Sequence, residues 1–172
     1  MGMRRSRWNA FGGVAALAGL FSLFLITPST CLAQGLSKED KHVLETYALT
    51  IENLNKTIAA QKGIDKIVAA DSSIAKSNAP PPGETLDQKV KRIDANSKIA
   101  GAIHSVGLST RDKALTEACA MTAYLSSESI KAGMPPEQAA RTFGWKPSAA
   151  QIEFAKAHHA ERERWIHASM GQ

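Results

Sequence analysis

The chain has 172 residues, of which 44% are hydrophobic and 22% charged, proportions that exclude a disordered or fibrous protein. Its formal net charge is +5, but three of its 21 basic residues, Arg4, Arg5 and Arg7, stand at the extreme N-terminus. Without them, 18 basic residues face 16 acidic ones, a net charge of about +2. This balance excludes a strongly basic protein built to bind nucleic acid.

The first 33 residues have the pattern of a secretory signal peptide. Three arginines precede an uncharged apolar stretch at 11–26, and Cys31 and Ala33 are the small residues that precede a cleavage site. The apolar stretch, about 16 residues, is shorter than the roughly 20 residues of a membrane-spanning helix. We expect cleavage after Ala33, a mature chain without a stable membrane span, and a periplasmic or secreted location. An uncleaved membrane anchor and a lipoprotein acylated at Cys31 are the alternatives.

Cysteine usage gives little information about chemistry. After cleavage, Cys119 is the only cysteine that remains, so the mature chain has no internal disulfide. Cys119 lies in an apolar stretch with a helical pattern, and nothing near it in the sequence indicates an activated thiol. We expect a buried and unreactive side chain.

Residues 34–172 are expected to form a single all-α domain, a compact antiparallel helical bundle with short accessory helices. No window of the sequence alternates polar and apolar residues over the length of a strand. In the first part of the domain, apolar residues from Val43 to Ile58 share one face of a helix. We expect this helix to begin after an N-cap at Ser37 and to end or bend at Gly63, with a weaker helix continuing to Ala75.

A loop with three consecutive prolines, residues 77–83, follows and is too short to separate two domains. After it, Thr85 and Asn96 are expected to cap two short helices, at about 86–94 and 97–106. One straight helix over this region would divide its apolar residues between two faces, which favours the break.

Three more helices are expected, in chain order at about 110–131, 136–143 and 149–170. Ser109 and Ser148 are the expected caps of the first and third, and Gly144 closes the second. The first of these helices has an expected inward-facing stripe of mostly small residues, which let a neighbouring helix approach closely. The stripe consists of Ala114, Leu115, Ala118, Met121, Thr122 and Leu125.

The common catalytic and cofactor motifs are absent from the sequence. It has no Cys-x-x-Cys-His for covalent haem, no His-Glu-x-x-His, no phosphate-binding loop, no nucleophile elbow and no dinucleotide-binding glycine pattern. We therefore assign no catalytic residue, no metal ion and no cofactor, and the sequence favours a protein that is not an enzyme.

One polar cluster, on the last expected helix, remains as a candidate site. On a helical wheel, Phe154 and Trp165 form one apolar edge, and three polar side chains fall in an arc that otherwise points inward. We call this group the last-helix cluster, and its members are the candidate ligand- or partner-binding residues Phe154, His158, His159, Arg162 and Trp165.

The last-helix cluster has three interpretations. In the structural one, His158 hydrogen-bonds across the bundle and Arg162 pairs with a carboxylate. In the second, the cluster lines a pocket between helices that binds a small anionic or aromatic ligand. In the third, His159 and Glu163 share a metal ion, although two ligands are too few for a stable site.

Four segments resemble a group of small, secreted, all-helical proteins of Gram-negative bacteria. The resemblance covers most of residues 34–172 and implies export and a helical fold, but no particular activity. It also implies that His158 and Glu161 are the pair of residues typical of this group, and that His159 is not part of that pair. The segments that carry it are residues 42–50, 91–96, 106–112 and 154–158.

These observations favour an exported helical-bundle protein of the cell envelope that binds an envelope protein or a small ligand. An enzyme with a site around His158 and Arg162 is a weaker alternative. The main alternative is a periplasmic helical chaperone or stress protein, because such proteins expose an apolar face edged by basic residues. The residues available for that edge are Lys66, Lys76, Lys89, Lys91, Arg92 and Lys98.

Overall fold

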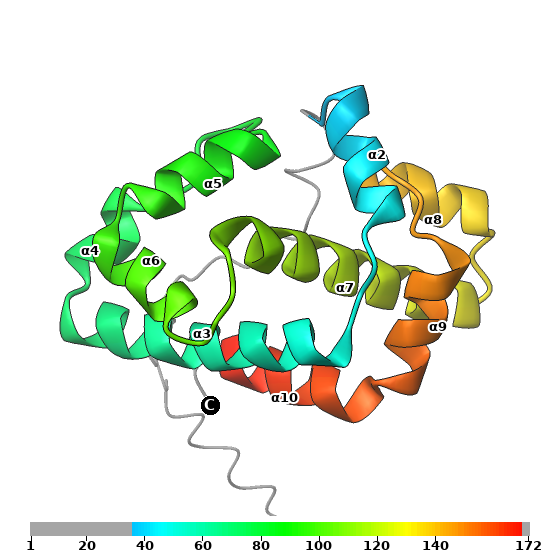
Figure 1. Ribbon diagram of the computed structural model, residues 1–172. Helices are drawn as coiled ribbons and strands as arrows, with labels where there is room; N and C mark the ends of the chain where they lie inside the picture. The colour runs from blue at the N-terminus through cyan, green and yellow to red at the C-terminus, as the bar shows by residue number, and fades with distance from the viewer. Residues whose placement is uncertain (1–35, 170–172) are drawn as a thin grey trace, which may run out of the picture.

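The computed structural model describes residues 36–169, and all regular structure in that range is helical (Figure 1). The all-α prediction is therefore confirmed for this part of the chain, whereas the expected signal peptide and its cleavage site lie outside the described residues. The helices are α2 (Lys38–Thr46), α3 (Ile51–Ala70), α4 (Ser73–Ser77), α5 (Leu86–Asp94), α6 (Ser97–His104), α7 (Thr110–Lys131), α8 (Pro136–Phe143), α9 (Ala149–Ala157) and α10 (His159–Ser169).

Helix starts lie where the sequence predicts them wherever a capping residue was identified. Each predicted cap accepts a hydrogen bond from the backbone N–H three residues further on, which satisfies a donor that the first helical turn leaves free. The expected break between α5 and α6 is confirmed, and so is the left-handed glycine that closes α8, Gly144 with φ 78°. The confirmed caps are Ser37, Thr85, Asn96, Ser109 and Ser148.

The expected single helix through Val43 and Ile58 is wrong, because the chain leaves the helical conformation after Thr46. Tyr47 is extended, with φ −64° and ψ 124°, and α3 starts only at Ile51. Thr50 caps that second start by accepting a hydrogen bond from the Asn53 N–H at 3.1 Å. The apolar face continues across the break, which is why periodicity alone does not reveal it.

Gly63 lies inside α3 and does not end it, contrary to the expectation. A Cβ atom at this position would lie 3.4 Å from the Cβ of Ala102 on α6, so the two helices touch here. α3 ends instead at Ala70, and Asp71 and Ser72 separate it from the short helix α4.

The last expected helix is also divided, at His158, where φ is −109° and ψ is 41°. Backbone hydrogen bonds continue across the break, because the His158 N–H bonds to Phe154 and the His158 carbonyl accepts from Arg162. The chain turns at this point and α10 runs back beside α3 (Figure 1). The break thereby brings Trp165 into the core beside Leu54 and Ile58.

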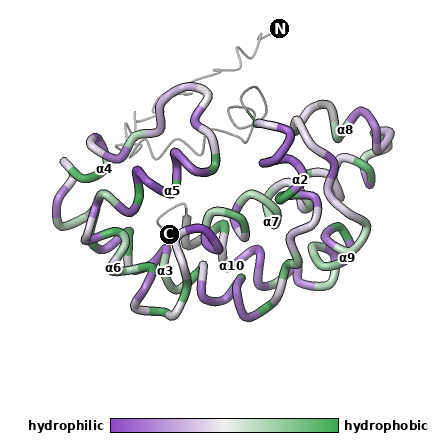
Figure 2. The backbone as a smooth tube through the Cα atoms, turned by 45° about the horizontal axis from the view of Figure 1, so that its top comes forward, coloured by the Kyte–Doolittle hydropathy of each residue, from purple (hydrophilic) through white to green (hydrophobic). Residues whose placement is uncertain are grey.

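Helix α7 lies at the centre of the fold, antiparallel to α3 and in contact with α2, α3, α5, α6, α8 and α9 (Figure 1). Twelve of its 22 residues are buried, so the predicted stripe was too narrow. Met121 and Leu125 of that stripe are only half-buried, whereas Cys119 and Ala123 beside it are fully buried. In contrast to the buried α7, the outer helix α5 consists mostly of hydrophilic residues (Figure 2).

The core has three hydrophobic clusters, of which the first and third include residues of α7. The first joins Leu44 of α2 to Leu86 of α5, the second joins Ile64 of α3 to Ile103 of α6, and the third contains Trp165. Among the described helices, none combines the length and the apolar character that crossing a bilayer demands.

Candidate functional site

The structure brings four members of the last-helix cluster together, although they come from two helices. Phe154 of α9 and His158 at its end meet Arg162 and Trp165 of α10 around a small void that Tyr124 of α7 also lines. The volume of this void is about 10 Å³, comparable to the space that one water molecule needs. In this arrangement the cluster is a packed contact without room for an aromatic ligand.

Arg162 is the buried charge of the cluster, with 6% of its surface exposed. Its guanidinium lies 3.6 Å above the ring centre of Tyr124, an arrangement that favours a cation–π interaction. Its Nη2 atom also lies 2.9 Å from Nε2 of His159 and donates to Glu163. Arginine only donates hydrogen bonds, so in this contact Arg162 is the donor and Nε2 of His159 the acceptor.

Within residues 36–169, the side chain of His158 forms no hydrogen bond across the bundle. Its Nδ1 atom lies 3.8 Å from Oε2 of Glu161, and its ring packs against that of Phe154, with 4.4 Å between the ring centres. Glu161 and His158 are thus neighbours three residues apart in the sequence. Arg164 pairs with the other oxygen of Glu161, at 3.2 Å.

The metal interpretation finds no support in the geometry. Both possible ligands, His159 and Glu163, are in contact with the same guanidinium nitrogen of Arg162. Within residues 36–169, no three side chains of His, Cys, Asp or Glu converge as metal ligands would.

Cys119 is buried, as predicted. Its thiol lies 3.4 Å from the carbonyl oxygen of Leu44, to which it can donate. Burial raises the pKa of this thiol from 9.0 to about 12, so the reactive thiolate is scarce at neutral pH. The structure therefore supports the interpretation of Cys119 as a packing residue.

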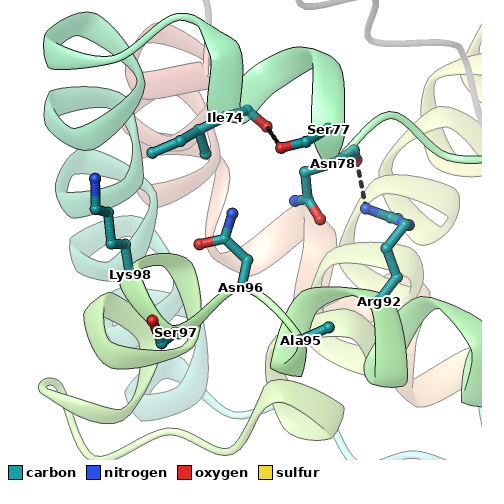
Figure 3. Close-up of a pocket in the computed structure, with 8 residues that line it drawn as sticks. All are labelled: Ile74, Ser77, Asn78, Arg92, Ala95, Asn96, Ser97 and Lys98. Atoms are coloured by element: carbon teal, nitrogen blue, oxygen red, sulfur yellow. Dashed lines mark hydrogen bonds between the residues drawn. The ribbon is translucent and has the colours of Figure 1, made fainter.

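A second candidate site lies at the other end of the molecule, between α4 and the junction of α5 with α6. We call it the α4–α6 pocket; it is open to solvent and its volume is about 410 Å³. Figure 3 shows the side chains of Asn78 and Asn96 between Lys98 on one side and Arg92 on the other. The remaining lining residues are Ile74, Ser77, Ala95 and Ser97.

Arg92 shapes one wall of the pocket through the proline-containing loop. Its Nε and Nη2 atoms donate to the two carboxylate oxygens of Glu84, at 2.6 and 2.8 Å, and Nη1 donates to the carbonyl of Asn78 at 2.5 Å. Asn78 directly follows α4 and Glu84 lies two residues before α5, so one guanidinium fixes both sides of the proline-containing loop to α5. Glu84 is itself buried, which makes this ion pair a structural element of the wall.

Several polar groups in the α4–α6 pocket are not used by the fold. Asn96 accepts from the Ile99 N–H through its oxygen, which leaves its amide nitrogen without a partner among the described residues. The side-chain amide of Asn78 likewise forms no hydrogen bond to the described part of the chain, where only its backbone carbonyl is bonded. Sequence reasoning assigned Asn96 a capping role alone and did not identify the pocket, because its lining comes from three helices and two loops.

Neither the last-helix cluster nor the α4–α6 pocket contains a set of residues that identifies a known reaction. Their geometry is therefore the basis for any functional interpretation. Comparison with known proteins gives no further guide, because no protein-family model, no curated protein and no solved structure matches the chain.

Proposed function

We propose that the protein is an exported, non-enzymatic binding protein of the cell envelope, with a compact antiparallel helical bundle as its mature form. The α4–α6 pocket is its binding site for a small ligand. Its volume of about 410 Å³ lies within the range of small-molecule sites, about 300–1,000 Å³. The polar groups that the fold leaves unused in this pocket are the feature on which the proposal depends.

The lining of the pocket favours binding over catalysis. None of the eight lining residues is a histidine, a cysteine or a carboxylate. The lining serines and Lys98 are of a type that can act as nucleophiles, but a serine needs a neighbouring base to activate it, and no histidine or carboxylate lines the pocket. Amides, hydroxyls and cations are groups that hold and orient a ligand.

The chaperone alternative is less well supported. Such a protein needs an exposed apolar face, and in residues 36–169 the only exposed large hydrophobic side chain is Ile51, at 37%. Two of the basic residues considered for its edge are paired with carboxylates, namely Lys89 with Glu117 and Arg92 with Glu84.

A steric block tests the binding proposal. Ala95 is exposed at the C-terminus of α5 and lines the pocket, so Ala95→Trp fills it without disturbing the core. Ala132 is the matched control, an exposed alanine at the C-terminus of α7 outside the pocket. The processed protein, labelled with ¹⁵N, is titrated with small organic acids, amides and amines, and the backbone signals of Asn78 and Ser97 are followed by NMR.

We expect at least one of these compound classes to shift both signals in the wild type and in Ala132→Trp, but not in Ala95→Trp. If no class shifts them at millimolar concentration, the pocket is not a binding site. Shifts that persist in Ala95→Trp also contradict the proposal, because the ligand would then bind elsewhere.

Export is tested independently by the intact mass of the protein recovered from its host. We expect the mass of a chain that begins at Gln34, found in the periplasm or the medium. Recovery of residues 1–33 in a membrane fraction contradicts cleavage and supports the anchor alternative. An added lipid mass on Cys31 supports the lipoprotein alternative.

A further inference from the structure

The charged groups that line the α4–α6 pocket have one sign. Arg92 and Lys98 are cationic, and no carboxylate is among the lining residues. The acidic partners of these two residues, Glu84 and Asp71, stand outside the lining. A ligand in the pocket therefore meets two cations and no carboxylate among the lining residues, which favours an anion.

Lys98 is available to such a ligand. Its ammonium lies 3.6 Å from Asp71, and 64% of its side chain is exposed, so this ion pair is weak. Asp71 is already held by Ser73, whose hydroxyl and backbone N–H donate to the same oxygen at 2.6 and 3.2 Å. These two hydrogen bonds, more than the charge of Lys98, hold the pKa of Asp71 below its ordinary value. Moving the ammonium to a ligand thus leaves Asp71 with its main partners.

The uncharged groups of the pocket supply further donors. The amide nitrogen of Asn96 and the side-chain amide of Asn78 have no acceptor among the described residues. Arg92 uses three N–H groups on Glu84 and Asn78 out of the five that a guanidinium carries. Carboxylate and phosphate oxygens accept several such hydrogen bonds at once, whereas an ammonium group accepts none.

We infer that the α4–α6 pocket binds a small organic anion through its carboxylate or phosphate oxygens, with Lys98 as the mobile charged contact and the amides of Asn78 and Asn96 as donors. Ala95 and Ile74 provide an apolar wall for the rest of the molecule. This inference rests on the proposed binding function and specifies the ligand class for the same site.

Four probes of similar size and different charge test the inference. Benzoate and phenyl phosphate are anions with different acidic groups, benzamide is the neutral counterpart of benzoate, and benzylamine is a cation at neutral pH. Each is titrated into the processed wild-type protein, Lys98→Ala and Lys91→Ala, with the signals of Asn78 and Ser97 as readout. Lys91 is the matched control, because it is an exposed lysine of α5 that does not line the pocket.

We expect benzoate or phenyl phosphate to bind at least about tenfold more tightly than benzamide, and benzylamine to bind least well. Lys98→Ala should weaken the binding of the preferred anion about tenfold, whereas Lys91→Ala should leave it within about twofold, and added salt should weaken it in every variant. The preferred anion identifies the acidic group.

Equal or tighter binding of benzamide or benzylamine overturns the anion inference but leaves the binding function intact. Equal losses of affinity for the preferred anion in Lys98→Ala and Lys91→Ala overturn the role of Lys98, because the effect would then be one of net charge. If none of the four probes shifts the signals, the anion inference fails, and the broader titration with amides and amines described above decides the binding function separately.

Discussion

The side-chain amide nitrogen of Gln151, on α9, lies 2.8 Å from the backbone carbonyl oxygen of Tyr47, in the extended segment between α2 and α3. The same nitrogen donates to the carbonyl of Leu44, also at 2.8 Å. Gln151 is almost fully buried, at 2% exposed. It thus provides partners for two carbonyls near the point where α2 ends, and those carbonyls would otherwise be costly to bury.

Replacing Gln151 by glutamate should lower the free energy of unfolding by about 2–4 kcal/mol, because a carboxylate cannot donate to the two carbonyls. The capping role is retained, since the carboxylate still accepts from the Ser148 N–H, as the amide does at 2.9 Å. Urea denaturation at neutral pH measures the change. Gln88 occupies the equivalent capping-box position at the exposed start of α5, and Gln88→Glu should be nearly neutral. Similar small effects in both variants would show that the donated bonds contribute little.

Trp165→Ala should lower the free energy of unfolding by about 3–5 kcal/mol, because the indole is 5% exposed and packs with Leu54 and Ile58. Denaturant melts measure the loss, and Arg164→Ala on the exposed face of α10 should stay within about 0.5 kcal/mol. In a processed Trp145→Phe chain, Trp165 should fluoresce with a blue-shifted maximum. A solvent-like maximum together with an unchanged midpoint for Trp165→Ala would reassign this face of α10 to the surface.

Glu117→Gln should destabilise the protein by about 3 kcal/mol at neutral pH, because it leaves the buried ammonium of Lys113 without its charged partner. Burial alone raises the pKa of Glu117, but Lys113 and Lys89 together outweigh it and hold that pKa below the ordinary value of 4.5. A lowered folded-state pKa stabilises the native protein above about pH 4.5, and this contribution is lost as the pH falls through the folded value.

The difference in the free energy of unfolding between the wild type and Glu117→Gln should therefore shrink when denaturation is repeated below about pH 4. Glu52 provides the control, because it forms the same i, i+4 pair with Lys56 on the surface, where its side chain is 72% exposed. Glu52→Gln should change the stability little at any pH. A difference for Glu117→Gln that stays constant with pH would contradict the ionic origin of its effect.

Cys119 should react slowly with a thiol reagent in the native protein and rapidly in denaturant. Its side chain is buried and its pKa is raised to about 12, so both access and thiolate formation are restricted. An Ala59→Cys variant in a Cys119→Ser background serves as the exposed control, since Ala59 faces solvent on α3. Equal native rates at the two positions would mean that α7 opens readily or that Cys119 is not packed.

Local signals in the sequence were sufficient to place most helix starts. A capping residue such as Thr85 or Ser109 acts on the backbone within three residues, so the sequence contains the whole interaction. The break after Thr46 could not be found in that way. The carbonyls exposed there are satisfied by Gln151, whose position depends on the tertiary fold, although Thr50 was an available sign of a new helix start.

The candidate sites, too, were predictable only where they depend on local sequence and not on the tertiary fold. The last-helix cluster was found because Phe154, His158 and Arg162 recur at helical spacing, but the break at His158 and the contact with Tyr124 depend on how α10 meets α3 and α7. The α4–α6 pocket had no sequence signal, because its residues come together only when the loop is fixed to α5 by Arg92.

The packing of α10 against α3 has a consequence for biosynthesis. Leu54 and Ile58 lie near the beginning of the described chain, and Trp165, which covers them, lies near its end. A ribosome releases the N-terminal part first, so this apolar face of α3 stays uncovered until the last helix has emerged. The nascent chain therefore cannot close this third hydrophobic cluster before its synthesis is nearly complete, whereas the cluster around Ile64 and Ile103 can close much earlier.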